Sequence, residues 1–164
     1  MHDQRGLALQ VAAAAGLVDA GAHPLGHGLT ERIPYLARQE RLTFARMGVT
    51  DPRSLADYEA HDGWVGLTRA LQMDPAAIVQ QVLDSGLRGR GGAAFPAGIK
   101  WKTVLGTTSA QKYVVCNADE GDSGTFSDRM TMEGDPYMLI EGMAIAAYAM
   151  GTRVGYNYIH GEIF

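Results

Sequence analysis

Residues 112–159 decide the fold, because a strand, a helix and a second strand follow one another there. Lys112-Tyr-Val-Val-Cys116 is a short β-branched and apolar run, which predicts a buried strand. Asp135-Pro136 is an N-cap residue followed by proline, and the apolar residues after it continue on nearly every face to Gly151, which predicts a buried helix. Arg153-Val-Gly-Tyr-Asn-Tyr-Ile159 predicts another strand. This order predicts an α/β fold with two parallel strands joined by a right-handed crossover.

Polar residues follow both strands. Parallel strands end at the same edge of a sheet, where α/β proteins bind ligands. Asn117-Ala-Asp119-Glu120 and Gly161-Glu162 occupy those two ends, and Asp122 adds a third carboxylate to the first. Carboxylates there can accept hydrogen bonds from hydroxyls and ring N–H groups, or bind a hard cation. The spacing does not fit a calcium loop, so a ligand with hydroxyls or a heterocycle is favoured over a metal, and a solvated acidic turn is the alternative.

A glycine-rich loop precedes the first strand. Between Gly86 and Lys102 the chain carries five glycines, four cations (Arg88, Arg90, Lys100 and Lys102), and the aromatic residues Phe95 and Trp101. Glycines without a Cβ let several N–H groups approach one oxyanion, and the cations supply opposite charge. The segment therefore predicts an anion-binding loop, and a flexible basic surface loop is the alternative.

Two familiar glycine motifs do not explain this loop. A P-loop fails, because Ile99 follows Gly98 where lysine is required. Gly89-x-Gly91-x-x-Ala94 has the letters of the dinucleotide fingerprint, but that fingerprint follows a strand. Here the preceding segment predicts a helix that begins at Asp74-Pro75 and ends at Gly86. The pattern argues against an ordinary Rossmann fold.

Composition limits the remaining classes. The chain has 164 residues, of which 46% are hydrophobic and 20% charged, and predicts one domain with an appendage. A net charge of −4, with the cations gathered in one loop, argues against nucleic-acid binding. The single cysteine, Cys116, can neither close an intrachain disulfide nor supply four ligands to an iron–sulfur cluster.

The N-terminal half carries little visible chemistry. We expect an extension over residues 1–29, a lead-in of short helices over 30–73, and the α/β part over 74–164. The apolar run Leu7–Val18 is too short to span a bilayer and favours a small amphipathic helix over an export signal, so we expect a cytoplasmic protein without membrane insertion. Ser54 with Asp57 resembles a capping box. His2, His23, His27 and His61 share no metal-ligand spacing and are assigned no role.

Several of these motifs together resemble one known family, the flavin- and NADH-binding subunit of respiratory complex I. The same module recurs in NAD-reducing hydrogenases and NAD-dependent formate dehydrogenases. The resemblance runs from about residue 30 to the end and rests on residues 86–101, Cys116–Gly121, Gly124-Thr125, Asp128-Arg129, Asp135-Pro136, Leu139–Met143 and Gly161-Glu162. Residues 121–130 and 133–136 are most similar to the beta subunit of formate dehydrogenase, so we expect an NAD-dependent formate dehydrogenase complex, with complex I and NAD-reducing hydrogenase as alternatives.

The resemblance implies FMN and NAD as ligands and assigns a role to each matching position. The positions for the FMN phosphate and flavin are Gly89, Arg90, Gly91, Gly92 and Lys100, and those for the ribityl chain and ring edges are Asn117, Asp119 and Glu120. Phe95 is implied to stack on the nicotinamide nucleotide, and Asp122 to lie near the nicotinamide where many members carry glutamate. Ala94 and Ala97 replace a more usual glycine and threonine, and the Cβ of Ala94 restricts the backbone. No catalytic side chain is implied, because hydride passes between the two cofactors.

The family resemblance also implies partners and further segments. The subunit passes electrons to or from iron–sulfur clusters in a multi-subunit dehydrogenase complex. It normally continues with a Gly-Glu-Glu-Thr loop and a cysteine-rich segment for a four-iron cluster, and neither occurs in these 164 residues. We therefore expect a truncated product, a partial FMN-binding domain that alone is inactive and binds FMN weakly or not at all. A non-catalytic docking module and a phosphate-binding protein outside this family remain as alternatives.

Overall fold

The computed structural model describes residues 32–122 and 124–161. The chain divides into two units, Met1–Leu42 and Thr43–Phe164, and the described part of the first contains the short helix α2 (Pro34–Ala37). The amphipathic helix expected at Leu7–Val18 lies outside the described residues. Within the described ranges, no helix has both the length and the apolar character needed to cross a membrane.

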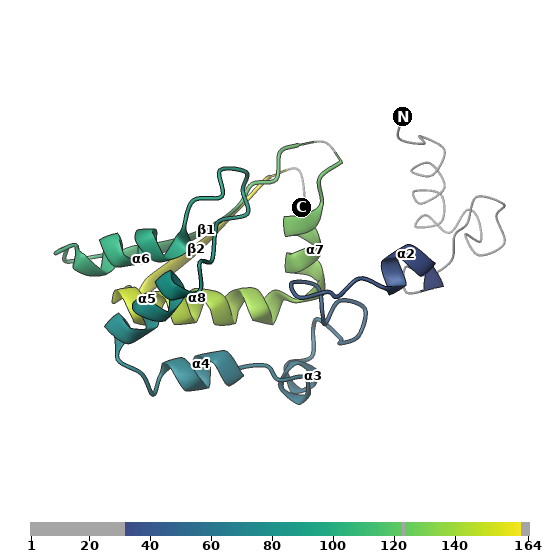
Figure 1. The fold of residues 1–164 in the computed structure, drawn as a ribbon, viewed down its shortest axis with the longest axis horizontal. Coiled ribbons are helices and arrows are strands. Elements are labelled where there is room, and N and C mark those ends of the chain that lie inside the picture. The colour runs from purple at the N-terminus through teal and green to yellow at the C-terminus, as the bar shows by residue number, and fades with distance from the viewer. Residues whose placement is uncertain (1–31, 123, 162–164) are drawn as a thin grey trace. The chain divides into compact units, whose positions relative to one another are not determined.

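The second unit contains six helices and two strands in its described residues (Figure 1). In chain order they are α3 (Leu55–Ala60), α4 (Val65–Ala70), α5 (Pro75–Asp84), α6 (Ala97–Gly106), β1 (Tyr113–Ala118), α7 (Ser127–Gly134), α8 (Pro136–Met150) and β2 (Val154–Ile159).

The predicted strand–helix–strand unit is confirmed. β1 and β2 pair in parallel, from Tyr113 opposite Val154 to Ala118 opposite Ile159. α8 connects them, with the Asp135 carboxylate accepting a hydrogen bond from the Met138 N–H at 3.3 Å, and it ends at Gly151 in the left-handed region (φ +67°). The chain is α/β, as expected, and α7 is an additional helix in the crossover.

The prediction of a buried first strand is wrong for one face of the sheet. Tyr113 and Val115 on β1 are 53% and 58% exposed, and Tyr156 and Tyr158 on β2 are 57% and 56% exposed. Paired residues of parallel strands share a face, so these four side chains, with Asn117, form one uncovered face. The described helices leave this face open, while α8 contacts both strands.

The prediction of a fully buried second helix is also only partly right. Ala146, Ala149 and Met150 near the end of α8 are buried, whereas Ile140 in its first half is 52% exposed. The buried end packs in the core, which joins Ala70 of α4 and Ile78 and Val79 of α5 to Ala149. The apolar pattern of α8 therefore continues beyond the part of the helix that neighbouring elements cover.

The expectation that the loop continues to Lys102 is wrong, because helix α6 begins within that segment. The chain enters this helix at Ala97, directly after Pro96, and α6 packs closely on α5. At the contact, a Cβ on Gly98 would lie 2.6 Å from Leu83 Cα, which is closer than real side chains allow. α5 itself begins and ends as predicted, with the Asp74 carboxylate accepting from the Ala76 N–H at 2.8 Å and Gly86 at φ +67°.

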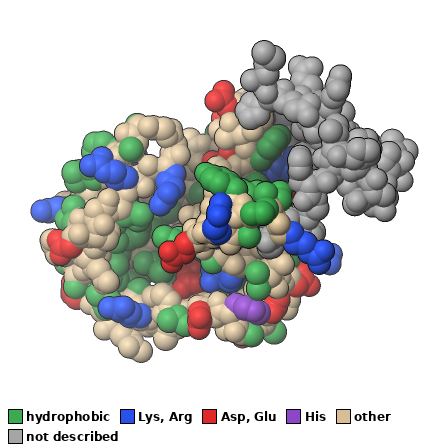
Figure 2. All heavy atoms as spheres, turned by 45° about the vertical axis from the view of Figure 1, so that its right-hand side comes forward, with side chains coloured by type: hydrophobic (Ala, Val, Ile, Leu, Met, Phe, Trp, Pro, Cys, Tyr) green, Lys and Arg blue, Asp and Glu red, His purple; other side chains and the backbone are tan. Residues whose placement is uncertain are grey.

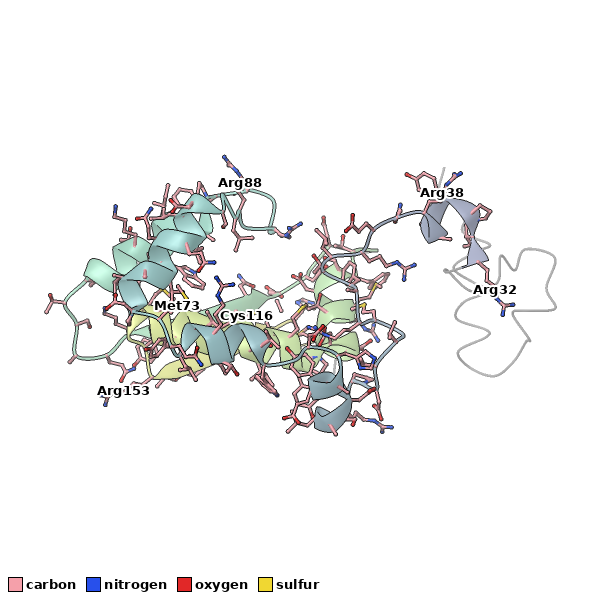
Figure 3. The ribbon with its side chains drawn as sticks, turned by 60° about the horizontal axis from the view of Figure 1, so that its bottom comes forward. Arg32, Arg38, Met73, Arg88, Cys116 and Arg153 are labelled. Atoms are coloured by element: carbon pink, nitrogen blue, oxygen red, sulfur yellow. The ribbon has the colours of Figure 1, made fainter. Side chains whose placement is uncertain are left out.

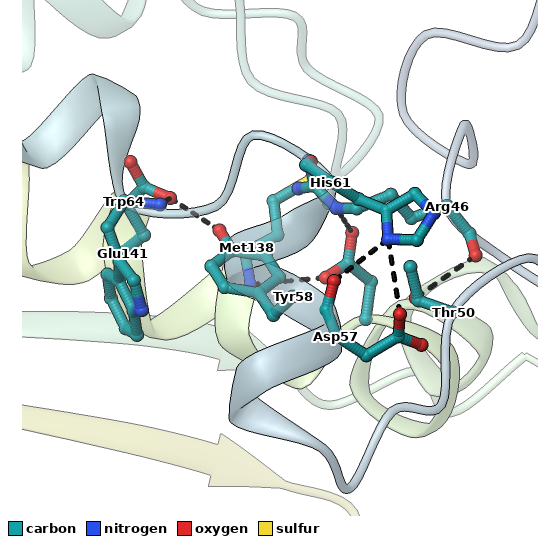
Figure 4. Close-up of polar contacts among 9 residues, drawn as sticks. Arg46, Thr50, Asp57, Tyr58, His61, Trp64, Met138 and Glu141 are labelled. Atoms are coloured by element: carbon teal, nitrogen blue, oxygen red, sulfur yellow. Dashed lines mark hydrogen bonds and ion pairs between the residues drawn. The ribbon is translucent and has the colours of Figure 1, made fainter.

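A buried polar network joins the lead-in to α8 (Figure 4). The Tyr58 hydroxyl, on a side chain that is 2% exposed, donates to Glu141, whose carboxylate also accepts from the Trp64 N–H at 2.9 Å and the Leu67 N–H at 2.8 Å. Arg46 Nε lies 2.8 Å from Asp135 Oδ2, and its guanidinium lies 4.7 Å from the Tyr58 ring centroid. We call Arg46, Tyr58, Asp135 and Glu141 the anchor network.

Two groups of the anchor network have displaced pKa values. Burial, and then the hydrogen bond to Glu141, raise the pKa of Tyr58. Burial acts to raise the pKa of Glu141 as well, but hydrogen bonds from Tyr58, Leu67 and Trp64 outweigh it and hold that pKa below the usual value. The carboxylate is therefore retained in its charged form inside the fold.

Candidate functional site

The glycine-rich loop is closed by its own backbone. Arg88 and Pro96 form an antiparallel bridge, the Gly89 N–H donates to Phe95 O at 2.9 Å, and the Ala97 N–H donates to Leu87 O at 2.8 Å. The Arg88 guanidinium spans the loop and donates from Nη1 to Ala94 O at 2.9 Å. Gly89 N–H and Arg88 thus serve the loop itself, although the sequence placed them in an anion site.

The tip of the loop is open main chain. Arg90, Gly91 and Gly92 are exposed, and a Cβ at either glycine would meet nothing within 4 Å. Gly92 has φ +103°, and Ala94 has φ +50°, so an alanine takes a left-handed conformation where the family resemblance implies glycine. Such a conformation costs a residue with a Cβ about 1–2 kcal/mol. The loop is therefore held in a definite shape despite its exposure.

Phe95 and Lys100 lie next to one another at the start of α6. Lys100 Nζ is 5.6 Å from the Phe95 ring centroid, and the Phe95 side chain is 45% exposed. Pro96, the N-cap residue, makes no side-chain hydrogen bond to the helix. The N–H groups of a helix start carry partial positive charge, which adds to that of Lys100.

The acidic turn after β1 divides its side chains between different partners. Asn117 Oδ1 accepts from the Asp119 N–H at 3.0 Å, which fixes the start of the turn. The Glu120 carboxylate turns toward α7 and accepts from the N–H groups of Asp128 and Arg129 and from the Ser127 hydroxyl, at 3.1–3.2 Å. Glu120 therefore caps α7, a role that the sequence did not indicate.

This capping determines the charge state of Glu120. Burial acts to raise the pKa of Glu120, but the hydrogen bonds from Asp128, Arg129 and Ser127 outweigh it and lower the pKa below its ordinary value. Burial, and then the nearby Glu120 charge, raise the pKa of Asp128. The turn thus keeps a carboxylate ionised against the helix start.

Two residues that the sequence analysis left without a role join this turn. His160 Nδ1 lies 2.8 Å from Asp119 Oδ1, and Tyr158 lies opposite Asn117 in the sheet register. The strand register pairs Ala118 with Ile159 and so places the next residues of the two strands together, and this register could not be predicted from the sequence. Glu162, expected at the same edge, lies outside the described residues.

The loop and the turn are not bonded to each other. Within residues 88–96 and 117–122, the described part of the chain shows no hydrogen bond or ion pair that links the two segments. In Figure 1 the loop between α5 and α6 and the carboxyl ends of both strands lie toward the same end of the sheet. The flavin assignment requires the loop and the turn to face one shared cleft. In the described residues, no hydrogen bond or ion pair of the chain joins the two sides of such a cleft.

A cavity lies elsewhere in the unit. It has a volume of about 310 Å³ between α4, α5 and α8, and its wall includes Met73, Ile78, Val82 and Ile145, with Arg69 as a charged member. None of the predicted site residues lines it. On the face drawn in Figure 2, hydrophobic side chains also reach the surface in several places between charged ones.

Comparisons with known proteins agree with this arrangement of motifs. Residues 82–163 match the model of the Nuo51 FMN-binding domain. The chain is 51% identical over 125 residues to the NADP-reducing hydrogenase subunit HndC of Solidesulfovibrio fructosivorans, covering 76% of this chain and 25% of that protein. It is 48% identical over 124 residues to an NADH-quinone oxidoreductase subunit of Rhizobium meliloti (strain 1021), covering 75% and 30%.

A solved structure is also similar. The air-oxidized NAD+-reducing NiFe-hydrogenase matches 97% of this chain and 25% of its own chain, with a TM-score of 0.57 and 27% identity. This chain therefore spans about a quarter to a third of the length of these relatives. The matched range contains the glycine-rich loop, the acidic turn and both strands. The chain belongs to the family of the Nuo51 FMN-binding domain, the complex I 51 kDa type.

Proposed function

We propose that this chain supplies part of the flavin site of an NAD(H)-linked oxidoreductase subunit. The observation that carries the proposal is the match of residues 82–163 to an FMN-binding domain, because that range contains every site residue expected from the sequence. FMN, when bound, accepts or donates hydride and couples this two-electron step to one-electron carriers. The residues of this chain would bind and orient the cofactor and shield it.

The residues present fit a phosphate-bearing ligand at the loop. The tip offers main chain without side-chain obstruction at Gly91 and Gly92, next to Arg90 in the chain, and Lys100 adds positive charge beside Phe95. Gly89 shapes the loop through its bond to Phe95 O. The exposed Phe95 ring, next to Lys100, provides a face for a nicotinamide nucleotide.

The acidic turn fits the hydroxyl-bearing part of the same ligand. Asn117 and Asp119 lie at the carboxyl end of β1, where they can exchange hydrogen bonds with hydroxyls and ring atoms. Glu120 acts indirectly, because its cap on α7 holds the turn in place. Asp122 lies on the same turn, which supports a contact with the nicotinamide nucleotide.

The wider assignment follows the relatives. Subunits of NADH-quinone oxidoreductases and of an NAD-reducing hydrogenase are among them, so we propose a multi-subunit dehydrogenase of this type, with iron–sulfur partners, in the cytoplasm. The formate dehydrogenase complex that the sequence favoured becomes an alternative here, because it rests on residues 121–130 and 133–136 alone. A docking module without turnover is the other alternative.

Titration of the 164-residue chain with FMN tests the proposal. Of the two outcomes that the sequence left open, weak binding or none, we propose weak binding, with a dissociation constant above about 1 µM, because the loop and the turn are not joined. Arg90→Ala should weaken binding about tenfold, as loss of a charge-assisted hydrogen bond does. Arg153→Ala is the matched control, since Arg153 is exposed at the amino end of β2, on another side of the unit from the Arg88 loop (Figure 3).

Two results would contradict the flavin proposal. One is the absence of FMN binding at millimolar concentration by a folded chain. The other is an equal loss of affinity in the Arg153→Ala control. A docking module would instead assemble with partner subunits while showing neither flavin absorbance nor NADH–ferricyanide activity.

A further inference from the structure

The edge at which β1 and β2 end carries a side-chain pair of which the flavin assignment uses only one member, Asp119. Asp119 follows Ala118, the last paired residue of β1, and His160 follows Ile159, its partner on β2. His160 Nδ1 lies 2.8 Å from Asp119 Oδ1, and both side chains remain more than one-third exposed. The pair therefore lies at the surface, at the edge where ligands bind in α/β sheets.

Asp119 is held from two directions. Its backbone N–H donates to Asn117 Oδ1, which fixes the main chain, and His160 fixes one oxygen of its carboxylate. An ionised carboxylate only accepts hydrogen bonds, so His160 Nδ1 carries the proton in this contact. The contact engages Oδ1 and thereby sets the orientation of the second oxygen, Oδ2.

Resting on the proposed flavin site, we propose that His160 is a positioning residue for Asp119. By holding Oδ1, the imidazole orients Oδ2 to accept a hydrogen bond from a hydroxyl of the ribityl chain. A carboxylate that is already oriented loses less side-chain freedom when the ligand binds, which strengthens binding. His160 therefore acts on the polyol part of the ligand through Asp119.

A double-mutant cycle tests this role. In the 164-residue chain, His160→Ala should weaken FMN binding about tenfold, while His160→Asn, which can donate from a similar place, should recover most of the affinity. In an Asp119→Ala background, His160→Ala should cause no further loss. Lumiflavin, which has the ring but lacks the ribityl chain, should bind the His160→Ala and unsubstituted chains equally.

The chain offers a matched control in His61. Its Nδ1 lies 2.8 Å from the Asp57 backbone oxygen and 3.3 Å from Asp57 Oδ1 on α3, so it is an imidazole next to an aspartate at a different place. His61→Ala should leave FMN affinity unchanged, and urea unfolding of each variant separates affinity loss from loss of fold. If His160→Ala does not fold, His160→Asn and Asp119→Asn still test the coupling.

Each outcome of these measurements either supports or overturns the positioning role of His160. Unchanged FMN affinity in His160→Ala, or an equal loss in the Asp119→Ala background, overturns the positioning role while the flavin site stands. An equal loss of affinity for lumiflavin also overturns the positioning role, because the pair would then act only by joining the two strands. Absence of FMN binding by the unsubstituted chain overturns the proposed function and this inference with it.

Discussion

The anchor network and the proposed ligand edge, which comprises the loop tip (Arg90–Gly92) and the acidic turn (Asn117–Asp122), use similar side chains in opposite ways. In the anchor network, Tyr58 donates to Glu141, Arg46 pairs with Asp135, and Glu141 also accepts from backbone N–H groups. At the ligand edge, the loop tip and the acidic turn remain exposed, and Asp119 has only part of its carboxylate engaged by His160. The difference separates polar groups that stabilise the fold from polar groups that remain available to a ligand.

Truncation of the anchor should have the largest effect. Tyr58→Ala removes a buried ring and leaves Glu141 with one donor fewer, so we expect a loss of about 3–5 kcal/mol in the free energy of unfolding, measured with urea. Tyr35→Ala is the control, because Tyr35 is 69% exposed and its loss should cost no more than about 0.5 kcal/mol. Similar losses in both variants would contradict the importance of the network.

A change in the close packing of α6 against α5 should give the next largest effect. Gly98→Ala places a Cβ against the backbone of Leu83, so we expect a loss of about 1–3 kcal/mol from overpacking. Gly106→Ala on the same helix meets nothing within 4 Å and should stabilise slightly. If both substitutions destabilise equally, the close contact between α5 and α6 is not what requires glycine.

Backbone shape at the loop should matter for ligand binding more than for stability. Gly92→Ala puts a Cβ on a residue with φ +103°, which strains the tip by about 1–2 kcal/mol and should weaken FMN binding roughly five- to thirtyfold. Gly91→Ala is the comparison, because Gly91 has no positive φ and its Cβ would meet open space. An equal loss in both variants would indicate that the ligand contacts both positions directly.

Acidification should produce the smallest effect, at α7. The pKa of Glu120 is depressed in the folded chain, so its cap contributes stability above the ordinary value of 4.5 and loses it as the pH falls through the lower folded value. We expect a change of about 0.5 kcal/mol, seen as lower protection factors, relative to the intrinsic exchange rates at each pH, for the amides of Asp128 and Arg129. Glu120→Gln should remove this pH dependence, whereas Glu133→Gln at the far end of α7 should retain it.

Local sequence signals predicted the parts of the fold that depend on local chemistry. The Asp-Pro starts of α5 and α8 and the glycine at each end are positions where one or two residues satisfy helix termini. α7 was missed because its cap, Glu120, lies seven residues before Ser127. α6 was missed because its first residues belong to the glycine-rich segment that the sequence pattern assigned to a loop.

Long-range contacts explain what the sequence could not show. His160 and Asp119 are 41 residues apart, and Tyr58 and Glu141 are 83 apart, so neither pair has a local pattern. The burial of β1 was wrong for a related reason. An apolar strand shows that a face can be covered, whereas the exposure of Tyr113 and Val115 depends on which elements reach it.

The uncovered face of the two-stranded sheet has a practical consequence for every solution experiment. Parallel strands normally have both faces covered, and open strand edges are templates for pairing between molecules. Tyr158 lies on that face opposite Asn117, so self-association through the face would bring a second molecule against a residue of the acidic turn and hinder flavin binding there. The apparent FMN affinity should then fall as protein concentration rises, and saturating flavin should keep the chain monodisperse in light scattering.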